Sequence, residues 1–240
     1  SATEEKQILE DFNGASADYP LDSTIVKLFE SVVDKYPNNK ALVYKNREYT
    51  YRELSQITDY IGAKLRESGV QRDDKVPVSV DRSEYIVIGA LSISKAGGAY
   101  IFIDPTYPFN RKEYIVKDCN SKIVLVDSNS KGVFTPIEGV EEEFHFEELL
   151  KEIEKVDEVK KLEYVNKPQD IFGIITTSGS TGEPKGTMIE HRNYINFAYY
   201  YNGLTDTKPG DQVASYASFS FDVSVATNFA PLLHGATVHI

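Results

Sequence analysis

The sequence predicts an α/β fold, with layered, mostly parallel sheets flanked by helices. Short apolar or β-branched runs alternate along the chain with segments of helical periodicity. The stretches between successive strands are long enough to hold a helix, and such crossovers join parallel strands. One strand-like run, residues 172–176, leads directly into a segment of small, hydroxylated and glycine residues, so this strand is expected to end at a loop with free backbone N–H groups.

Composition limits the class of protein. The 240 residues are 41% hydrophobic and 26% charged, which is ordinary for a globular chain with a real core. The net charge of -11 argues against nucleic acid and anionic membranes as partners, because the protein's own field repels both. No apolar run is long enough to span a bilayer, and the single cysteine, Cys119, permits no internal disulfide. We therefore expect a cytoplasmic protein in which Cys119 is a buried small hydrophobe.

The N-terminal part of the chain divides into an arm and the start of the main domain. Residues 1–20 show weak periodicity and are expected to form a lead-in arm before a domain that covers residues 21–240. Within that domain, Thr24 is expected to cap a helix that ends at Tyr36.

A hairpin and a second helix are expected next. Residues 41–50 have the alternation and the turn residues of a hairpin. Thr50 and Glu53 then form a capping box, which starts a helix that ends at Gly69.

The central part of the chain repeats the unit of strand and helix. The expected elements are, in order, a strand over 75–80, a helix over 83–96, a strand over 99–103, a helix over 110–118 and a strand over 122–127. Residues 138–163 are rich in Glu and Lys, with apolar residues among the charges. Because no cation-loop pattern accompanies these carboxylates, we expect a solvated helix with an apolar underside at the sheet edge.

A candidate phosphate-binding loop follows residues 172–176. Its members are Thr177, Ser178, Gly179, Ser180, Thr181, Gly182 and Lys185. Backbone N–H groups at the glycines can turn toward one anion, the hydroxyl groups can bond its oxygens, and the lysine adds positive charge. The alternative is an ordinary flexible surface loop.

A Walker loop is excluded by the spacing. That loop requires GxxxxGK[ST], whereas Glu183 and Pro184 stand between Gly182 and Lys185. Gly186 is expected to let the backbone turn away after the lysine.

At these residues the sequence resembles a known family. The run TTSGSTGEPKG is similar to the signature loop of the adenylate-forming superfamily, which includes acyl-CoA synthetases, luciferases and the adenylation domains of nonribosomal peptide synthetases. The run SKAGGAYIFIDPTYP resembles a segment of the amino-acid-activating members. The resemblance covers residues 21–240 and implies the N-terminal part of an adenylation domain.

A second informative stretch lies near the C-terminus. Residues 212–218 are strand-like, and Asp222 follows within an apolar segment. A buried aspartate requires a partner, so Asp222 is expected either to cap a helix over 223–233 or to bind a cation. The run ASFSFDVSV resembles the FDxSV segment of amino-acid adenylation domains, and the resemblance implies that Asp222 binds the α-ammonium group of the substrate.

The same resemblance implies three further substrate-binding residues. Phe221 and Val223 flank the aspartate, and Ala226 stands where relatives with aromatic substrates often carry tryptophan. One helical turn separates Asp222 from Ala226, so both are expected to face one cavity, and a small residue leaves room for a bulky or extended side chain.

The helix expected over residues 191–201 carries a histidine and several tyrosines. His191 is expected to have a structural hydrogen bond, its default role as a lone histidine. The tyrosines at 194, 199, 200 and 201 are expected to serve packing rather than to form a platform for a base.

The resemblance implies the reaction, the cofactors and the partners. A substrate carboxylate attacks the α-phosphate of ATP bound to Mg2+, which gives an aminoacyl-AMP and pyrophosphate, and the aminoacyl group then passes to the phosphopantetheine thiol of a carrier protein. The family's C-terminal lid and its catalytic lysine have no counterpart in this chain. No catalytic residue or metal ligand is therefore assigned here, and the segment alone is expected to be a poor catalyst.

Three alternatives remain open. The nearest is a stand-alone ligase that joins D-alanine to a carrier protein, which has similar motifs. The second is a non-catalytic nucleotide-binding or interaction fragment of the same fold. The third is a Walker-type ATPase, which the inserted Glu183 and Pro184 oppose.

Overall fold

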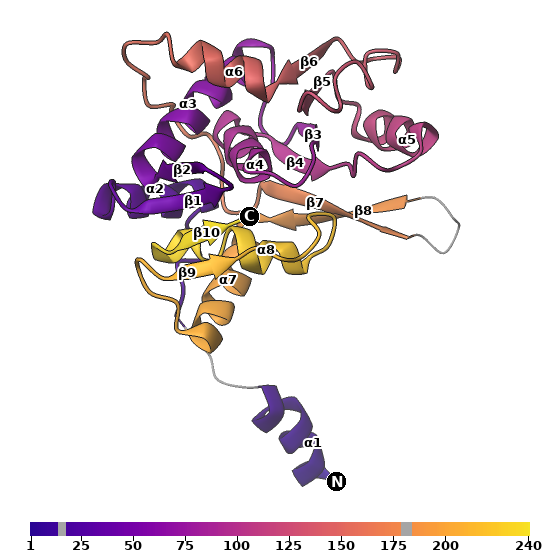
Figure 1. Ribbon diagram of the computed structural model, residues 1–240. Coiled ribbons are helices and arrows are strands. Elements are labelled where there is room, and N and C mark those ends of the chain that lie inside the picture. The colour runs from indigo at the N-terminus through magenta and orange to yellow at the C-terminus, as the bar shows by residue number, and fades with distance from the viewer. Residues whose placement is uncertain (14–17, 179–183) are drawn as a thin grey trace.

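The computed structural model describes residues 1–13, 18–178 and 184–240, and it contains two sheets with helices between and around them (Figure 1). The larger sheet has the strand order β6 (Glu142–His145), β5 (Ile123–Val126), β3 (Lys75–Ser79), β4 (Ala99–Phe102), β7 (Ile171–Ser178) and β8 (Pro184–Glu190). The smaller sheet has the order β2 (Arg47–Thr50), β1 (Lys40–Tyr44), β10 (Thr237–His239) and β9 (Gln212–Ala214). All neighbours pair in parallel except β7 with β8 and β1 with β2, so the predicted mostly parallel α/β fold is confirmed.

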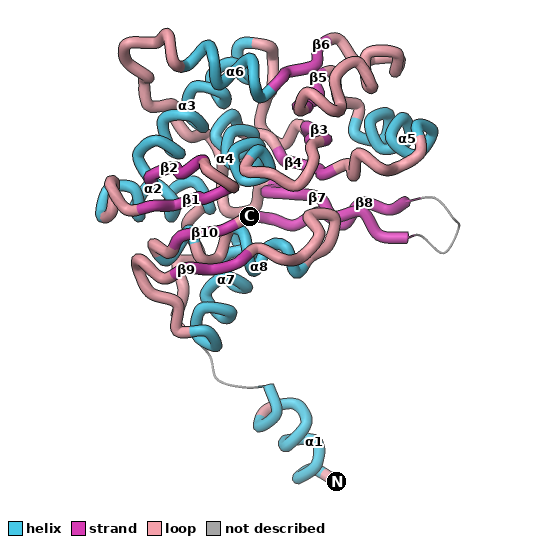
Figure 2. Tube along the Cα trace, viewed as in Figure 1, coloured by secondary structure: helices cyan, strands magenta, loops and turns pink. Residues whose placement is uncertain are grey.

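Figure 2 shows how the helices surround these strands. They are α1 (Ala2–Leu9), α2 (Ile25–Lys35), α3 (Tyr51–Glu67), α4 (Tyr85–Ala96), α5 (Phe109–Cys119), α6 (Phe146–Ile153), α7 (His191–Thr205) and α8 (Val223–Asn228), with short 3-10 turns at Asp11–Asn13 and Leu232–His234. Helix α1 contains no buried residue and is drawn apart from the sheets in Figure 1. The division into an arm and a domain near residue 20 stays a prediction.

Two apolar cores lie on opposite faces of the larger sheet. Strand β5 shows the alternation that separates them: Ile123 and Leu125 join the core that contains α4, whereas Val124 and Val126 join the core that contains α5. Every residue of α4 is buried, because this helix lies inside the larger core. The parallel strands therefore have both faces covered, as parallel strands require.

The capping signals in the sequence placed the helix starts correctly. The hydroxyl of Thr24 accepts a hydrogen bond from the N–H of Lys27 at 3.3 Å, at the start of α2. Thr50 and Glu53 form the expected reciprocal capping box at the start of α3. These contacts satisfy backbone donors that the first helical turn leaves unpaired.

The prediction of one helix over residues 138–163 is wrong. This stretch contains β6, then α6, and its described residues from 154 onward form neither helix nor strand. Strand β6 pairs in parallel with β5 at the edge of the sheet, and a highly charged sequence is well suited to an edge strand. Pairing with a neighbouring strand thus overrides the local helical pattern.

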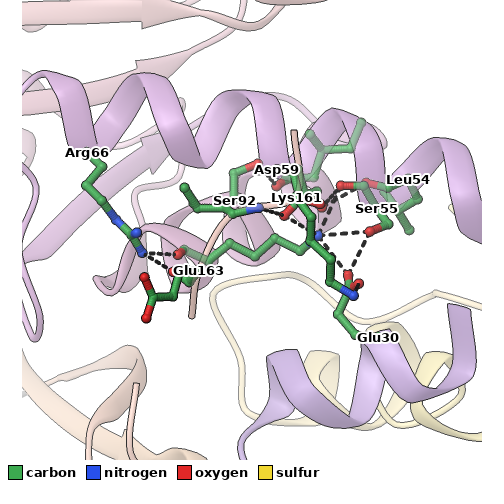
Figure 3. Close-up of polar contacts among 12 residues, drawn as sticks. Glu30, Leu54, Ser55, Asp59, Arg66, Ser92, Lys161 and Glu163 are labelled. Atoms are coloured by element: carbon green, nitrogen blue, oxygen red, sulfur yellow. Dashed lines mark hydrogen bonds and ion pairs between the residues drawn. The ribbon is translucent and has the colours of Figure 1, made fainter. Parts of the chain in front are cut away.

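A buried ion cluster joins the helices of the larger core (Figure 3). The ammonium group of Lys95, on α4, is 0% exposed and lies 2.8 Å from a carboxylate oxygen of Glu30 and 3.0 Å from one of Asp59. It also donates to the hydroxyl and the carbonyl oxygen of Ser55. Burial raises the pKa of Asp59; it acts the same way on Glu30, but attraction to Lys95 and hydrogen bonds from Lys95, Ser55 and Lys161 outweigh it and lower the pKa of Glu30.

Candidate functional site

The predicted phosphate-binding stretch lies on the hairpin of β7 and β8. Thr177 is paired with Lys185 across this hairpin, and the hydroxyl of Thr177 donates a hydrogen bond to the carbonyl oxygen of Lys185 at 3.3 Å. Both residues are exposed. Ser178 is the last residue of β7, whereas the predicted ligands Gly179, Ser180, Thr181 and Gly182 lie outside the described residues. The described part of the hairpin thus places a hydroxyl and an exposed lysine side by side at the base of the loop.

The expectation that Gly186 turns the backbone away is wrong. Gly186 lies within β8 and is paired with Thr176 of β7. A Cβ at this position would lie 2.9 Å from Cγ2 of Ile174. The glycine therefore allows the two strands to approach closely over that isoleucine.

The element after the loop also separates this site from a Walker loop. A strand, β8, follows the loop and runs antiparallel to β7. In a Walker loop a helix would start at this point. The structure therefore confirms that the loop is not a Walker loop.

Asp222 caps a helix and is exposed rather than buried. Its Oδ1 accepts a hydrogen bond from the N–H of Val223 at 2.8 Å, at the start of α8. The expectation of a buried carboxylate is wrong, because the chain reaches α8 over the surface: the residues at 221, 222 and 223 are all exposed. Helix α8 ends at Asn228, not at residue 233, and the strand expected over 212–218 ends at Ala214.

The other predicted substrate residues do not share one cavity. Phe221 is 64% exposed and Val223 is 48% exposed, whereas Ala226 is 3% exposed and belongs to the core. Ala226 lines neither of the cavities beside this segment. The helical spacing placed Asp222 and Ala226 one turn apart, but Asp222 is at the cap, where its side chain folds back on the helix end.

The two informative stretches nevertheless meet at the carboxyl ends of β4 and β7. Thr176, just before the loop, lines a cavity of about 10 Å³ together with Ser220 and Ser224. This is about the room needed for one water molecule. Phe219 and Ser220 also line a second cavity, of about 320 Å³, at the ends of β3 and β4. In open α/β sheets this edge of the strands is where ligands bind.

Sequence reasoning missed Arg82, which follows β3 at the same edge. Its guanidinium group donates hydrogen bonds to the carbonyl oxygens of Ser215 and Ala217, and it lies 5.1 Å from the ring centre of Phe219. The signal in the sequence was a cation shortly after the strand expected over 75–80, next to Asp81.

His191 and Tyr194 serve packing, as expected. The imidazole Nδ1 of His191 accepts a hydrogen bond from the N–H of Ile25 at 3.2 Å, and burial lowers the pKa of His191 to about 3. The hydroxyl of Tyr194 donates to the carbonyl oxygen of Val225 at 2.7 Å, which joins α7 to α8. Cys119 is buried, as predicted, and burial raises its pKa to about 12.

These features define a class: a layered α/β protein whose glycine-rich loop joins two strands at the ligand-binding edge of a sheet. The family model described as "AMP-binding enzyme" matches residues 29–240, and the chain belongs to this family. Gramicidin S synthase 2 of Brevibacillus brevis is 38% identical over 237 residues, which cover 99% of this chain and 5% of that protein. Gramicidin S synthase 1 of the same organism is 36% identical, over 99% of this chain and 21% of that protein. The chain thus spans a small part of these relatives.

Solved structures show the same fold. The nonribosomal peptide synthetase FmoA3 in its AMPPNP-bound form matches with a TM-score of 0.87 and 27% identity, over 98% of this chain and 24% of that chain. Its form bound to alpha-methyl-L-serine-AMP matches with a TM-score of 0.84, over 93% of this chain. The resemblance to adenylation domains of nonribosomal peptide synthetases is therefore confirmed.

Neither a metal-binding cluster nor a membrane-spanning helix occurs among the described residues. No cluster of three or more His, Cys, Asp or Glu residues suited to a metal ion occurs in the described part of the chain. Among the described helices, none is both long and apolar enough to cross a membrane.

Proposed function

We propose that this chain is the N-terminal part of an adenylation domain that activates an α-amino acid. The reaction consumes ATP with Mg2+ and gives an aminoacyl-AMP and pyrophosphate. One observation carries the proposal: Thr176, which leads into the glycine-rich loop, and Ser220 and Ser224, which flank Asp222, line the same cavity. This proximity of the residue before the loop to the residues around Asp222 supports one shared site for the ATP and the amino acid.

The chemistry requires positioning and charge neutralisation. The substrate carboxylate is itself the nucleophile, so a protein nucleophile is not needed. Because the carboxylate and the α-phosphate are both anionic, the rate depends on groups that orient the reactants and neutralise their charge. In this proposal Lys185, with the hydroxyls of Thr177, Ser178 and the loop, holds the departing phosphates. The exposure of Lys185 and Thr177 at the base of the loop supports this role.

The geometry of Asp222 supports a second role beside its cap. Only Oδ1 accepts the N–H of Val223, and Oδ2 has no hydrogen-bond or ion-pair partner among the described residues. A free carboxylate oxygen on an exposed cap remains able to bind the α-ammonium group of a substrate. We propose that Asp222 does both, with the exposed Phe221 and Val223 near the substrate side chain.

Further parts of the proposal concern partners outside this chain. The aminoacyl group passes to the phosphopantetheine thiol of a carrier protein, and the C-terminal part of the domain supplies the catalytic lysine. The protein acts in the cytoplasm, and residues 1–20 are an arm before the domain of residues 21–240.

Pyrophosphate exchange tests the proposal on the full-length protein. A panel of amino acids that includes D-alanine is expected to show exchange with at least one α-amino acid, and exchange with D-alanine alone would favour the carrier-protein ligase. Lys185→Ala is expected to weaken ATP binding, whereas the control Lys208→Ala, which removes an exposed lysine paired with Asp206, is not. Unchanged ATP affinity in Lys185→Ala, or exchange only with fatty or aryl acids, would contradict the proposal.

Two substitutions separate the roles of Asp222. Asparagine is as good an N-cap as aspartate but carries no charge. Asp222→Asn is therefore expected to keep the stability of α8 and to raise the KM for the amino acid as strongly as Asp222→Ala does, with little effect on the KM for ATP. If Asp222→Asn behaves like the wild type, Asp222 is a cap alone.

A further inference from the structure

We propose that Arg82 is a positioning residue for the substrate-binding segment, residues 215–222, in the adenylation reaction proposed above. The segment joins β9 of the smaller sheet to α8, and its described residues form neither helix nor strand. Its path therefore depends on contacts from elsewhere. Arg82 reaches it from the other sheet, because it follows β3.

The guanidinium group holds the segment at three places. One nitrogen donates to the carbonyl oxygen of Ala217 at 3.0 Å, and another donates to the carbonyl oxygen of Ser215. The group also lies over the ring of Phe219, with 5.1 Å to its centre. A planar cation with donors on separate nitrogens suits this arrangement, since a lysine ammonium has all its donors on one atom and cannot stack as a plane.

Nothing else among the described residues competes for the charge of Arg82. The carboxylate of its neighbour Asp81 accepts a hydrogen bond from the side-chain amide of Asn129 at 2.6 Å and forms no ion pair with Arg82. No described carboxylate lies within ion-pair distance of Arg82 itself. The guanidinium group is thus committed to backbone carbonyls rather than to a salt bridge.

The contacts lead directly to Asp222. Phe219 packs near Phe102 of β4, with 6.1 Å between ring centres, and it lines both cavities at the sheet edge. Beyond it, the hydroxyl of Ser224 donates to the carbonyl oxygen of Phe221 at 2.6 Å. The chain is therefore fixed on both sides of Asp222, by Arg82 before it and by the start of α8 after it. Removal of Arg82 frees the chain before Asp222. It removes no contact with β7 or β8, where the nucleotide is proposed to bind.

Arg66 provides a matched control. Its guanidinium group also donates to backbone carbonyls, those of Ala96 at 3.1 Å, Lys95 at 2.8 Å and Glu163 at 2.9 Å. It joins the end of α4 to the irregular stretch around Glu163, and both lie far from Asp222 in the sequence. A general loss of structure on removing such an arginine would therefore appear in both variants.

Hydrogen exchange in the full-length protein tests the positioning directly. In Arg82→Gln the segment loses its hydrogen bonds to a charged group and is expected to open more often. Its amides, in residues 215–222, are therefore expected to exchange at least about tenfold faster. In Arg66→Gln the faster exchange is expected near Glu163 and not in residues 215–222. Unchanged exchange of residues 215–222 in Arg82→Gln would overturn the inference, whether or not the protein activates an amino acid.

Pyrophosphate exchange then tests the consequence for the reaction. Arg82→Gln is expected to raise the KM for the amino acid about tenfold and to leave the KM for ATP within about twofold of the wild type. Arg82→Lys, which keeps the charge, covers the case in which the glutamine variant does not fold, and it is expected to show the same pattern in smaller degree. An equal rise of the KM for the amino acid and the KM for ATP would contradict the positioning role and show that Arg82 has only a general structural role. Absence of exchange in the wild type would contradict the proposed function, and the hydrogen-exchange result would still decide the role of Arg82.

Discussion

Replacement of Lys95 by methionine is expected to destabilise the protein more than the removal of a charge from any exposed side chain. Lys95 lies on a helix whose residues are all buried, and it contacts carboxylates of Glu30 and Asp59 that are themselves buried. After the substitution Glu30 keeps Lys161 at 2.9 Å, but among the described residues Asp59 keeps only the N–H of Leu162 at 3.4 Å. An uncompensated buried carboxylate of this kind destabilises a fold by about 3–5 kcal/mol.

Urea denaturation of the 240-residue chain measures this loss. With a slope of about 3 kcal/mol per molar urea, the midpoint is expected to fall by about 1 M or more without a change in slope. Lys161→Met is the matched control, because Lys161 binds the same Glu30 but its side chain is 56% exposed. Because Lys161 is exposed and Glu30 keeps Lys95 in this variant, the loss is expected to be about 0–1 kcal/mol.

A third variant checks the physical cause. In Asp59→Asn/Lys95→Met the buried carboxylate of Asp59 is removed together with its cation, so part of the lost stability is expected to return. The reasoning is refuted if Lys95→Met and Lys161→Met shift the midpoint equally, or if the double variant is no more stable than Lys95→Met.

Two other predictions concern buried groups. Burial holds the pKa of His191 near 3, below the ordinary value of about 6.5, so between these values the unfolded chain binds a proton that the folded chain does not. The contribution of neutral His191 to the free energy of unfolding is complete above about pH 6.5 and is lost toward pH 3, by at most about 1.4 kcal/mol per pH unit. In His191→Gln the urea midpoint is expected to depend less on pH in this range. Parallel plots of midpoint against pH for the variant and the wild type would contradict the assignment. Gly173→Ala is expected to destabilise the chain by about 1–3 kcal/mol, because its Cβ would lie 2.5 Å from the buried ring of Tyr100. The control Gly203→Ala has open space on α7 and is expected to stabilise it by about 0.5–1 kcal/mol, so equal midpoints in the two alanine variants would rule out the clash.

Local sequence signals predicted most of the fold because they act within a few residues of their cause. The capping contacts of Thr24 and Thr50 depend only on neighbours three residues away, and both are present. The buried strands were visible as apolar runs, since a parallel strand is covered on both faces. The glycine-rich motif is also a signal within a few adjacent residues, and the family that it indicates is the one that the family model matches.

The failures share a cause as well. Residues 138–163 have a helical pattern, yet part of them becomes β6 because β5 offers an open edge for pairing. Gly186 was assigned to a turn because glycine permits one, whereas the reason for it is Ile174 on the opposite strand. The burial of Asp222 was inferred from apolar neighbours, but Phe221 and Val223 are themselves largely exposed.

The sequence alone determined the alternation of strands and helices, their capped starts, and the chemistry of the loop that includes Thr177 and Lys185. Only the tertiary structure decided that Thr176, just before this loop, and the segment before Asp222 lie at one sheet edge, and that Arg82 holds the segment there. The reason is that the partners of Arg82 are the backbone carbonyls of Ser215 and Ala217, more than a hundred residues away. Every residue has such a carbonyl, so no side-chain pattern marks the ones that the fold brings within reach.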